Sequence, residues 1–361
     1  MTELAFTPYF TYWRSVELGS RVVLEGLVAP EHALPSPALA RDLARWDGAH
    51  YWQRSSDGRW LVLVREDAPQ RERWWLHALL LAVTLVTTTL GGAALAGADV
   101  RWWLPTIAQL RAGLPFSIPL LAILFAHESG HYVTARRYRV NASPPYFIPF
   151  PASWNIIGTL GAFIRLRSPL FDRRTLFDVG AGGPFAGALV AIPVVLIGLA
   201  RSVPDSTGPA LTAAHQYITV AGGPALLGDS LVLVLARMAL GLGTAVPLRL
   251  DLVAVAGWVG LFITSLNLLP LAQFDGGHIA YALFGRRQLW VARVLWVALL
   301  PLGRLWPGWW VWAVLALLVG RGSLLHPPVI ADERPLDARR RAAGWLAVAL
   351  FLITFSPMPI V

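Results

Sequence analysis

Two histidines and a glutamate within five residues are the strongest candidates for chemistry in this sequence. His127, Glu128 and His131 form an H-E-x-x-H pattern near the end of an apolar run that covers residues 113–132. On a helix, residues four positions apart face the same way, so both imidazoles can bind one zinc ion. A glutamate beside them can take a proton from zinc-activated water and pass it to a leaving amine. The pattern therefore indicates a metalloprotease with Glu128 as general base.

The sequence around this pattern indicates whether it is a metal site or a chance match. H-E-x-x-H is short, and in soluble helices it also occurs by accident. Here it lies in a hydrophobic segment, where ionisable groups are costly and mark functional sites. A histidine pair in lipid needs a partner, and nothing else on the same helix offers one. These observations favour a bound metal.

The third metal ligand has to come from a small set of residues. The chain has no cysteine, so histidine and carboxylate must hold any zinc. No glutamate occurs between Glu128 and Glu333, which leaves the few aspartates. Asp275 is a candidate because it lies at the end of an apolar segment and precedes Gly276 and Gly277, where the backbone can approach closely.

Two short motifs together resemble a known family. The H-E-x-x-H pattern and Asn267-Leu268-Leu269-Pro270 leading into Asp275-Gly276 look like the two signatures of the site-2 protease family of intramembrane zinc metalloproteases. Residues 158–164, 176–179, 182–184 and 256–258 resemble its bacterial and plastid branch, related to the ethylene-dependent gravitropism-deficient proteins. The similarity extends from about His127 to the C-terminus. Where the family usually has Leu-Asp-Gly, this chain has Phe274-Asp275-Gly276, an exchange of one apolar residue for another.

The resemblance implies a role for each residue of the site. Zinc would be held by His127, His131 and Asp275, Glu128 would activate water, and Asn267 would help to stabilise the tetrahedral oxyanion. Two imidazoles and one carboxylate leave a fourth position open for water. An amide donor beside developing negative charge favours the transition state.

Two further polar residues have alternative interpretations. His278 could orient a ligand or reach the metal, but an interfacial histidine near Arg286 and Arg287 is the favoured interpretation. Asn155 could hydrogen-bond a substrate backbone, and it could equally cap a turn.

Composition places the chain among membrane proteins. Its 361 residues are 56% hydrophobic and only 14% charged, with 17 tryptophans. All 30 basic residues are arginine, and they cluster beside the apolar segments. The net charge of +9 is therefore a signal of topology and not of nucleic-acid binding.

The first 75 residues predict a small cytoplasmic α+β domain outside the membrane. Ser36-Pro37 are typical of the start of a short helix through Trp46, and residues 51–54 and 59–64 flank a turn at 55–58. Residues 76–361 form the predicted transmembrane metalloprotease domain, with the core of the zinc site at about 113–287. No signal peptide is expected, because the basic-then-apolar layout is missing.

The membrane part predicts a polytopic α-helical protein with about seven crossings. The expected spans are residues 76–97, 113–138, 176–200, 252–269, 289–305, 306–319 and 342–355. Residues 141–174 are too broken by proline and glycine to cross, so we expect a re-entrant loop or short hairpin beside the site. An edge strand there can hold an unwound substrate by strand addition. The small residues of 180–187 predict close packing on the helix of His127 and His131.

A count of arginines gives the expected orientation. With a cytoplasmic N-terminus and seven crossings, 23 of the 30 arginines fall in the cytoplasmic segments 1–75, 136–175, 271–288 and 321–341. His131 and Asp275 then share a depth only if residues 226–243 do not cross. We therefore expect a re-entrant or external amphipathic helix there, with Asp229 and Arg237 facing water or each other.

The expected function is cleavage of a peptide bond within or next to a substrate's transmembrane helix. The partners would be a lipid bilayer and a transmembrane protein substrate, either a single-pass protein or a signal-peptide remnant, in a bacterial cytoplasmic membrane. The substrate must partly unwind, because helical backbone is shielded from the nucleophile. One alternative is a polytopic metal-binding transporter or scaffold, in which Glu128 would be dispensable. A proteolytically silent membrane chaperone is a third, which the intact residue set argues against.

Overall fold

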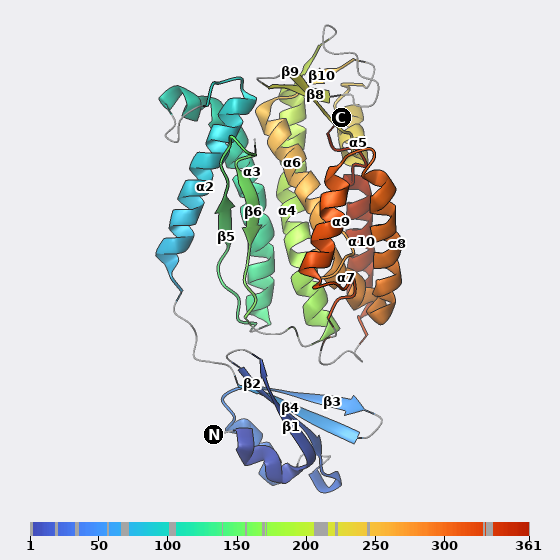
Figure 1. Cartoon of the computed structure of the whole chain (residues 1–361). Helices are drawn as coiled ribbons and strands as arrows, with labels where there is room; N and C mark the ends of the chain where they lie inside the picture. The colour runs from blue at the N-terminus through green and yellow to red at the C-terminus, as the bar shows by residue number, and fades with distance from the viewer. Residues whose placement is uncertain are drawn as a thin grey trace. The chain divides into compact units, whose positions relative to one another are not determined.

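The computed structural model divides the chain into two compact units, Met1–Glu72 and Arg73–Val361 (Figure 1). It describes residues 3–18, 21–32, 36–55, 58–65, 72–100, 106–138, 140–155, 157–167, 170, 172–205, 216–220, 223–243, 246–327, 329 and 335–360. Ser56 and Asp57 of the expected turn lie outside these residues, as does Arg139 of the expected basic cluster.

The N-terminal unit is a four-stranded antiparallel sheet with short helices. Its strands are β1 (Phe10–Leu18), β2 (Arg21–Val28), β3 (Ala49–Ser55) and β4 (Gly58–Arg65), in the order β1-β2-β4-β3. Two 3₁₀ helices, Glu3–Tyr9 and Pro30–His32, flank the first two strands. Phe6, Leu24, Leu39 and Leu61 belong to its buried core.

The local predictions for this unit are confirmed. Helix α1 (Pro37–Ala44) starts where expected, since the Ser36 side chain accepts a hydrogen bond from the Leu39 amide. Strands β3 and β4 form the expected hairpin, with Ser55 opposite Gly58. The β1–β2 hairpin was not predicted, although both segments are rich in β-branched and aromatic residues.

The second unit is a bundle of helices. Within the described part of the chain, three of them are long and apolar enough to cross a membrane: α2 (Trp74–Leu95), α3 (Ile107–Arg137) and α4 (Arg173–Arg201). Shorter helices follow: α5 (Leu231–Ala239), α6 (Leu252–Asn267), α7 (Asp275–Phe284), α8 (Gln288–Leu302), α9 (Gly308–Val319) and α10 (Ala338–Thr354), with a 3₁₀ turn at Gly285–Arg287. The α-helices other than α7 match the expected apolar segments, with ends shifted by up to six residues, whereas α7 was not predicted.

Small residues bring α3, α4 and α6 close together. A Cβ on Gly130 of α3 would lie 2.2 Å from the Gly182 carbonyl oxygen of α4. A Cβ on Gly198 would lie 2.1 Å from the Ala254 amide nitrogen of α6. Only glycine permits such backbone contact, so the predicted packing of residues 180–187 on the His127 helix is confirmed.

The described residues of the segment 141–174 contain a short hairpin, one of the two expected forms. Strands β5 (Tyr146–Pro149) and β6 (Thr159–Phe163) pair antiparallel, and a bridge between Ala142 and Leu166 extends the pairing. In Figure 1 this hairpin runs alongside α2 and α3. It places extended backbone among helices, next to the end of α3 that carries the histidines.

The segment between α4 and α6 begins and ends at neighbouring positions, beside the C-terminal end of α4 and the N-terminal end of α6. Strand β7 (Val203–Pro204) pairs with β10 (Leu248–Arg249), and the two-residue strands join β8 (Gln216–Val220) and β9 (Gly223–Leu227) in one sheet. Arg201 at the end of α4 forms an ion pair with Asp251, the N-cap of α6, at 3.4 Å. Helix α5 has nine residues, about 14 Å, too short to cross a bilayer. This short length supports the expectation that residues 226–243 do not cross, which stays a prediction.

Arg237 on α5 does not face water, which was one of the two surroundings expected for it, the other being Asp229. Its side chain is buried, and it donates hydrogen bonds to the carbonyl oxygens of Gly243 and Val246. Burial lowers the pKa of Arg237, and the negative charge of Asp229 opposes this shift. The guanidinium therefore closes the loop after α5, because buried carbonyl groups need donors.

Candidate active site

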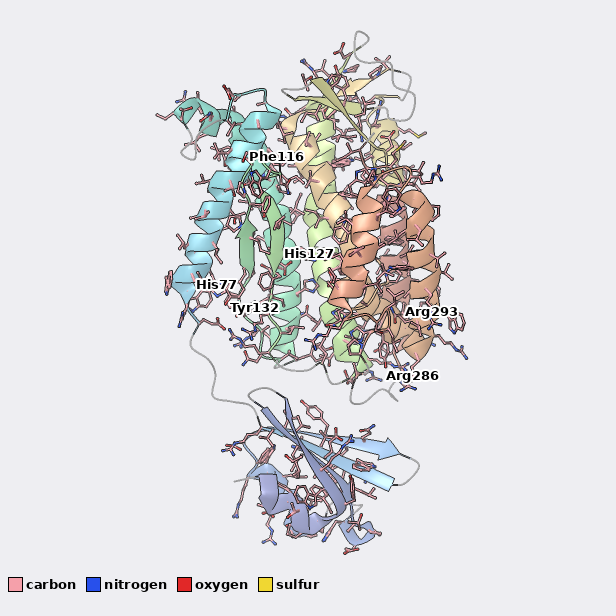
Figure 2. All side chains as sticks on the ribbon, viewed as in Figure 1. His77, Phe116, His127, Tyr132, Arg286 and Arg293 are labelled. Carbon is pink, nitrogen blue, oxygen red and sulfur yellow. The ribbon has the colours of Figure 1, made fainter. Side chains whose placement is uncertain are left out.

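Helix α3 carries the first three residues of the site. It begins with a capping box, in which the Thr106 hydroxyl accepts from the Gln109 amide and the Gln109 side chain accepts from the Thr106 amide. The helix then runs without a break to Arg137, so His127 and His131 are one turn apart. Both histidines and Glu128 are buried. Figure 2 shows His127 on α3, with Tyr132 further toward the C-terminal end of that helix.

The end of α6 and the start of α7 carry the other residues. Asn267 is the last residue of α6, and Asp275 is the first of α7. The chain reverses between them, with Ala272 in a left-handed conformation at φ 43°. A Cβ on Gly276 would lie 1.9 Å from the Leu268 carbonyl oxygen, so this tight turn needs glycine.

The turn brings Asp275 to the two histidines. His127 Nε2 and His131 Nε2 are 3.1 Å apart, and Asp275 Oδ2 lies 3.2 Å from the first and 3.3 Å from the second. The group could hold a metal ion. Zinc bonds of about 2.0–2.1 Å at tetrahedral angles separate ligand atoms by roughly 3.3 Å. The two imidazoles and the carboxylate therefore fit three corners of a zinc site.

The surroundings of His131 hold its ring in the form a metal requires. Its Nδ1 donates to the Val179 carbonyl oxygen of α4 at 2.7 Å, which leaves the lone pair on Nε2. Gly183 of α4 faces the same ring, and a Cβ there would lie 2.1 Å from Nε2. The glycine face of α4 thus makes room for a ligand as well as for the α3 backbone.

A cavity of about 260 Å³ opens at these residues. His127, Glu128, His131, Asn267, Asp275 and His278 line it, together with Ala162, Phe163, Ile164 and Leu166 of the hairpin. The Ile164 backbone amide lies near the Glu128 carboxylate. Asn267 Nδ2 lies 3.3 Å from His127 Nε2. The cavity can thus hold a peptide bond beside a carboxylate, an amide donor and a metal.

The structure shows the surroundings of His278 and Asn155, the two residues with alternative interpretations. The interpretation of His278 as an interfacial residue near the arginines is wrong, because it lines the cavity and its Nδ1 lies 2.7 Å from His326 Nε2. Asn155 caps a turn: its Oδ1 accepts from the Ile157 amide, and its Nδ2 donates to the Thr159 carbonyl oxygen. No local pattern identified His326, which lies 48 residues after its partner.

Comparisons with known proteins identify the family of this chain. The model of peptidase family M50 matches residues 115–298, just over half of the chain, and this range includes all five predicted site residues. A protein named probable zinc metalloprotease EGY2, chloroplastic, from Arabidopsis thaliana is 30% identical over 291 residues, which is 79% of this chain and 49% of that protein. The Arabidopsis thaliana protein named probable zinc metalloprotease EGY1, chloroplastic, is 32% identical over 256 residues, or 68% of this chain and 43% of that protein.

These relatives are longer proteins. This chain spans slightly less than half the length of each of the two. No solved structure matches it. The family model nevertheless covers the region that contains the histidine pair, Asn267 and Asp275, and the apolar helices are those of a membrane protein. The chain therefore belongs to peptidase family M50, the site-2 protease family whose signatures its sequence resembles.

Proposed function

We propose that this chain is an intramembrane zinc metalloprotease that hydrolyses a peptide bond within or next to a substrate's transmembrane helix. The observation that carries the proposal is the triangle of donor atoms from His127, His131 and Asp275, with edges of 3.1–3.3 Å, beside buried Glu128. The names of the relatives, probable zinc metalloproteases, support the choice of metal.

His127, His131 and Asp275 would hold the zinc. A zinc ion there supplies a Lewis acid that lowers the pKa of water and polarises a carbonyl. Other residues of the chain hold these ligands in position. The Val179 carbonyl keeps the His131 ring oriented, and the tight turn at Gly276 keeps Asp275 beside both histidines.

Glu128 acts as the general base. It lines the cavity, and the nearby Ile164 backbone amide is a donor that can orient its carboxylate. From there it takes a proton from the attacking water and returns it to the nitrogen of the leaving amine. Asn267 lines the same cavity and donates its Nδ2 hydrogens toward the oxygen on which negative charge develops.

The hairpin β5–β6 binds the substrate. Among the described residues β6 pairs with β5 alone, so its second edge has no strand neighbour. An unwound substrate segment can add to that edge, since an extended strand satisfies its backbone groups by such pairing. The residues that follow β6, Ile164 and Leu166, line the cavity, so a strand on this edge leads to Glu128.

The membrane topology has seven crossings, made by α2, α3, α4, α6, α8, α9 and α10. The return of the chain between Arg201 and Asp251 supports this number, because α5 then stays on one side. Helices α8 and α9 are short, and the exposed Trp290 and Trp310 suit an interfacial belt. The excess of arginine on one side supports a cytoplasmic N-terminal domain in a bacterial cytoplasmic membrane.

Replacing Glu128 by Gln separates this function from its rival, a metal-binding transporter or scaffold without proteolysis. The variant should retain about one zinc per chain and lose cleavage by roughly 100-fold or more, because an amide cannot accept the proton. Membrane proteomes of cells that express wild type or Glu128→Gln should differ in substrates that accumulate only with the variant. Cleavage of such a substrate at the wild-type rate would exclude the protease mechanism.

Cysteine labelling tests the topology, since the chain has no native cysteine. Single cysteines at Arg174 and Arg287 should be accessible from the cytoplasm, and those at Arg201 and Arg249, the exposed neighbour of buried Leu248, from outside. Labelling of Arg174 and Arg201 from the same side would contradict the crossing of α4.

A further inference from the structure

Half-buried His278 and buried His326 form a pair beside the proposed catalytic centre. His278 lies one turn after Asp275 on α7, and His326 follows α9 in the loop that leads toward α10. His278 Nδ1 and His326 Nε2 are 2.7 Å apart, and the two rings meet edge to face. The proposed mechanism uses neither residue.

The hydrogen bonds of the pair define where each proton lies. His326 Nδ1 lies 2.6 Å from the Pro327 carbonyl oxygen, and a carbonyl can only accept. His326 Nδ1 therefore carries a proton, and in the neutral ring Nε2 carries the lone pair. This lone pair accepts from His278 Nδ1. Neutral His278 is then left with a bare Nε2, an acceptor.

The packing around the pair holds this arrangement in place. Buried Gln288 accepts from the His326 amide at 3.2 Å and donates to the carbonyl oxygens of Pro270 and Leu324. Gly180 of α4 makes room for His278, since a Cβ there would lie 2.7 Å from the His278 Cβ. Burial lowers the pKa of His278 to about 3 and that of His326 to about 4, so both rings are neutral near pH 7.

His278 Nε2 is available to a molecule in the cavity. His278 lines the same cavity as Glu128, Asn267 and Asp275. No hydrogen-bond partner is found for its Nε2 within the described part of the chain, and this atom is not among the fully buried polar atoms that lack a partner. An unwound peptide brings backbone N–H groups into the cavity, and a buried donor without an acceptor is costly.

We propose that His278 is a substrate-binding residue whose Nε2 accepts a hydrogen bond from a backbone N–H next to the scissile bond. The His326–Pro327 relay fixes the tautomer that makes this possible. The proposal rests on the protease function proposed above, and it adds a contact that selects an unwound peptide, because a helical N–H is already bonded to its own carbonyl.

Nitrogen NMR of the full chain labelled with [¹⁵N]histidine tests the tautomer without any catalysis. Wild type in detergent should show His278 with a protonated Nδ1 and a bare Nε2, assigned by the loss of these signals in His278→Gln. In His326→Phe the acceptor is gone, and the population protonated at Nε2 should rise. A protonated Nε2 on His278 in the wild type would overturn the proposal.

Binding of two peptide hydroxamates to the zinc-loaded protein tests the contact. One has a free backbone N–H next to the metal-binding group, and the other is N-methylated there. Wild type should prefer the first by roughly tenfold, and His278→Phe should lose this preference. His278→Gln should restore several-fold preference, because its amide oxygen can accept.

Gln273→Leu serves as the matched control, since Gln273 lines the same cavity and its loss should leave the preference intact. Equal binding of the two hydroxamates by the wild type, or a preference that survives in His278→Phe, overturns the role of His278. Failure of both hydroxamates to bind any variant would contradict the metal site, and this proposal with it.

Discussion

Helix α7 borders two cavities with opposite chemistry. The cavity on the side of Asp275 and His278 has a volume of about 260 Å³ and includes every residue of the predicted metal site. The cavity on the side of Ile279 and Leu283 is larger, about 620 Å³, and its lining from α7, α8 and α10 has no ionisable side chain. The larger space thus lacks any group that could activate water. Function follows the convergent polar groups and not the volume.

The structural cause of this difference is the placement of small and ionisable residues. Gly180, Gly183 and Gly187 of α4 face His278, His131 and His127, so polar rings fill the space that side chains would occupy. The apolar cavity is lined by larger groups such as Trp290, Phe351 and Trp345. Four substitutions test whether the chemistry depends on only one of the two cavities.

Asp275→Ala should have the largest effect. It removes the only carboxylate of the donor triangle and should reduce the zinc content, measured by mass spectrometry of the purified protein, from about one to well below one per chain. Cleavage should fall at least as far as in Glu128→Gln. Ile279→Val, on the other side of the same helix, is the control and should retain the metal. Full zinc content in Asp275→Ala would show that the third ligand is another residue.

Gly183→Ala should have the next largest effect. Its Cβ would lie 2.1 Å from His131 Nε2, so the ring must leave its position. We expect zinc affinity to fall by roughly 10- to 100-fold in competition with a chelator. Gly187→Ala is the milder control. Its Cβ would lie 3.1 Å from His127 Nδ1, so zinc affinity should fall less than in Gly183→Ala. Equal affinity in both variants and wild type would mean that α4 does not shape the site.

Asn267→Ala should have a smaller effect, confined to turnover. Loss of one neutral donor to the developing oxyanion should lower kcat by about tenfold. Zinc content and KM should stay near wild type, since the residue is not among the three proposed ligands. A variant that loses zinc instead would assign Asn267 to holding the metal site together.

Val294→Phe should have the smallest effect. It enlarges an exposed side chain that lines the apolar cavity. The proposed chemistry does not use this cavity. The rate of cleavage should change by less than about twofold. A loss comparable to that of Asn267→Ala would break the comparison and assign a role in substrate entry to the apolar cavity.

Local rules determined much of this protein from its sequence. The spacing of His127 and His131 places both on one face because a helix turns every 3.6 residues. Apolar runs predicted the helices of the second unit other than α7, and Ser36-Pro37 predicted the start of α1. Proline and glycine in residues 141–174 excluded a crossing there. The requirement that His131 and Asp275 lie at the same depth predicted that residues 226–243 do not cross either. The pairing of β7 with β10, which brings the two ends of this segment together, supports that prediction.

The remaining features depended on contacts between distant segments. His131 meets the Val179 carbonyl 48 residues later, and Asp275 meets His127 across 148 residues. His278 was assigned to the interface because the residues near it in sequence are arginines, whereas its partner His326 comes from the far side of two helices. Periodicity fixes which way a side chain points from its own helix. The packing of the helices decides which carbonyl, glycine or histidine of a neighbouring element that side chain contacts. Such contacts between distant segments have no local pattern in the sequence.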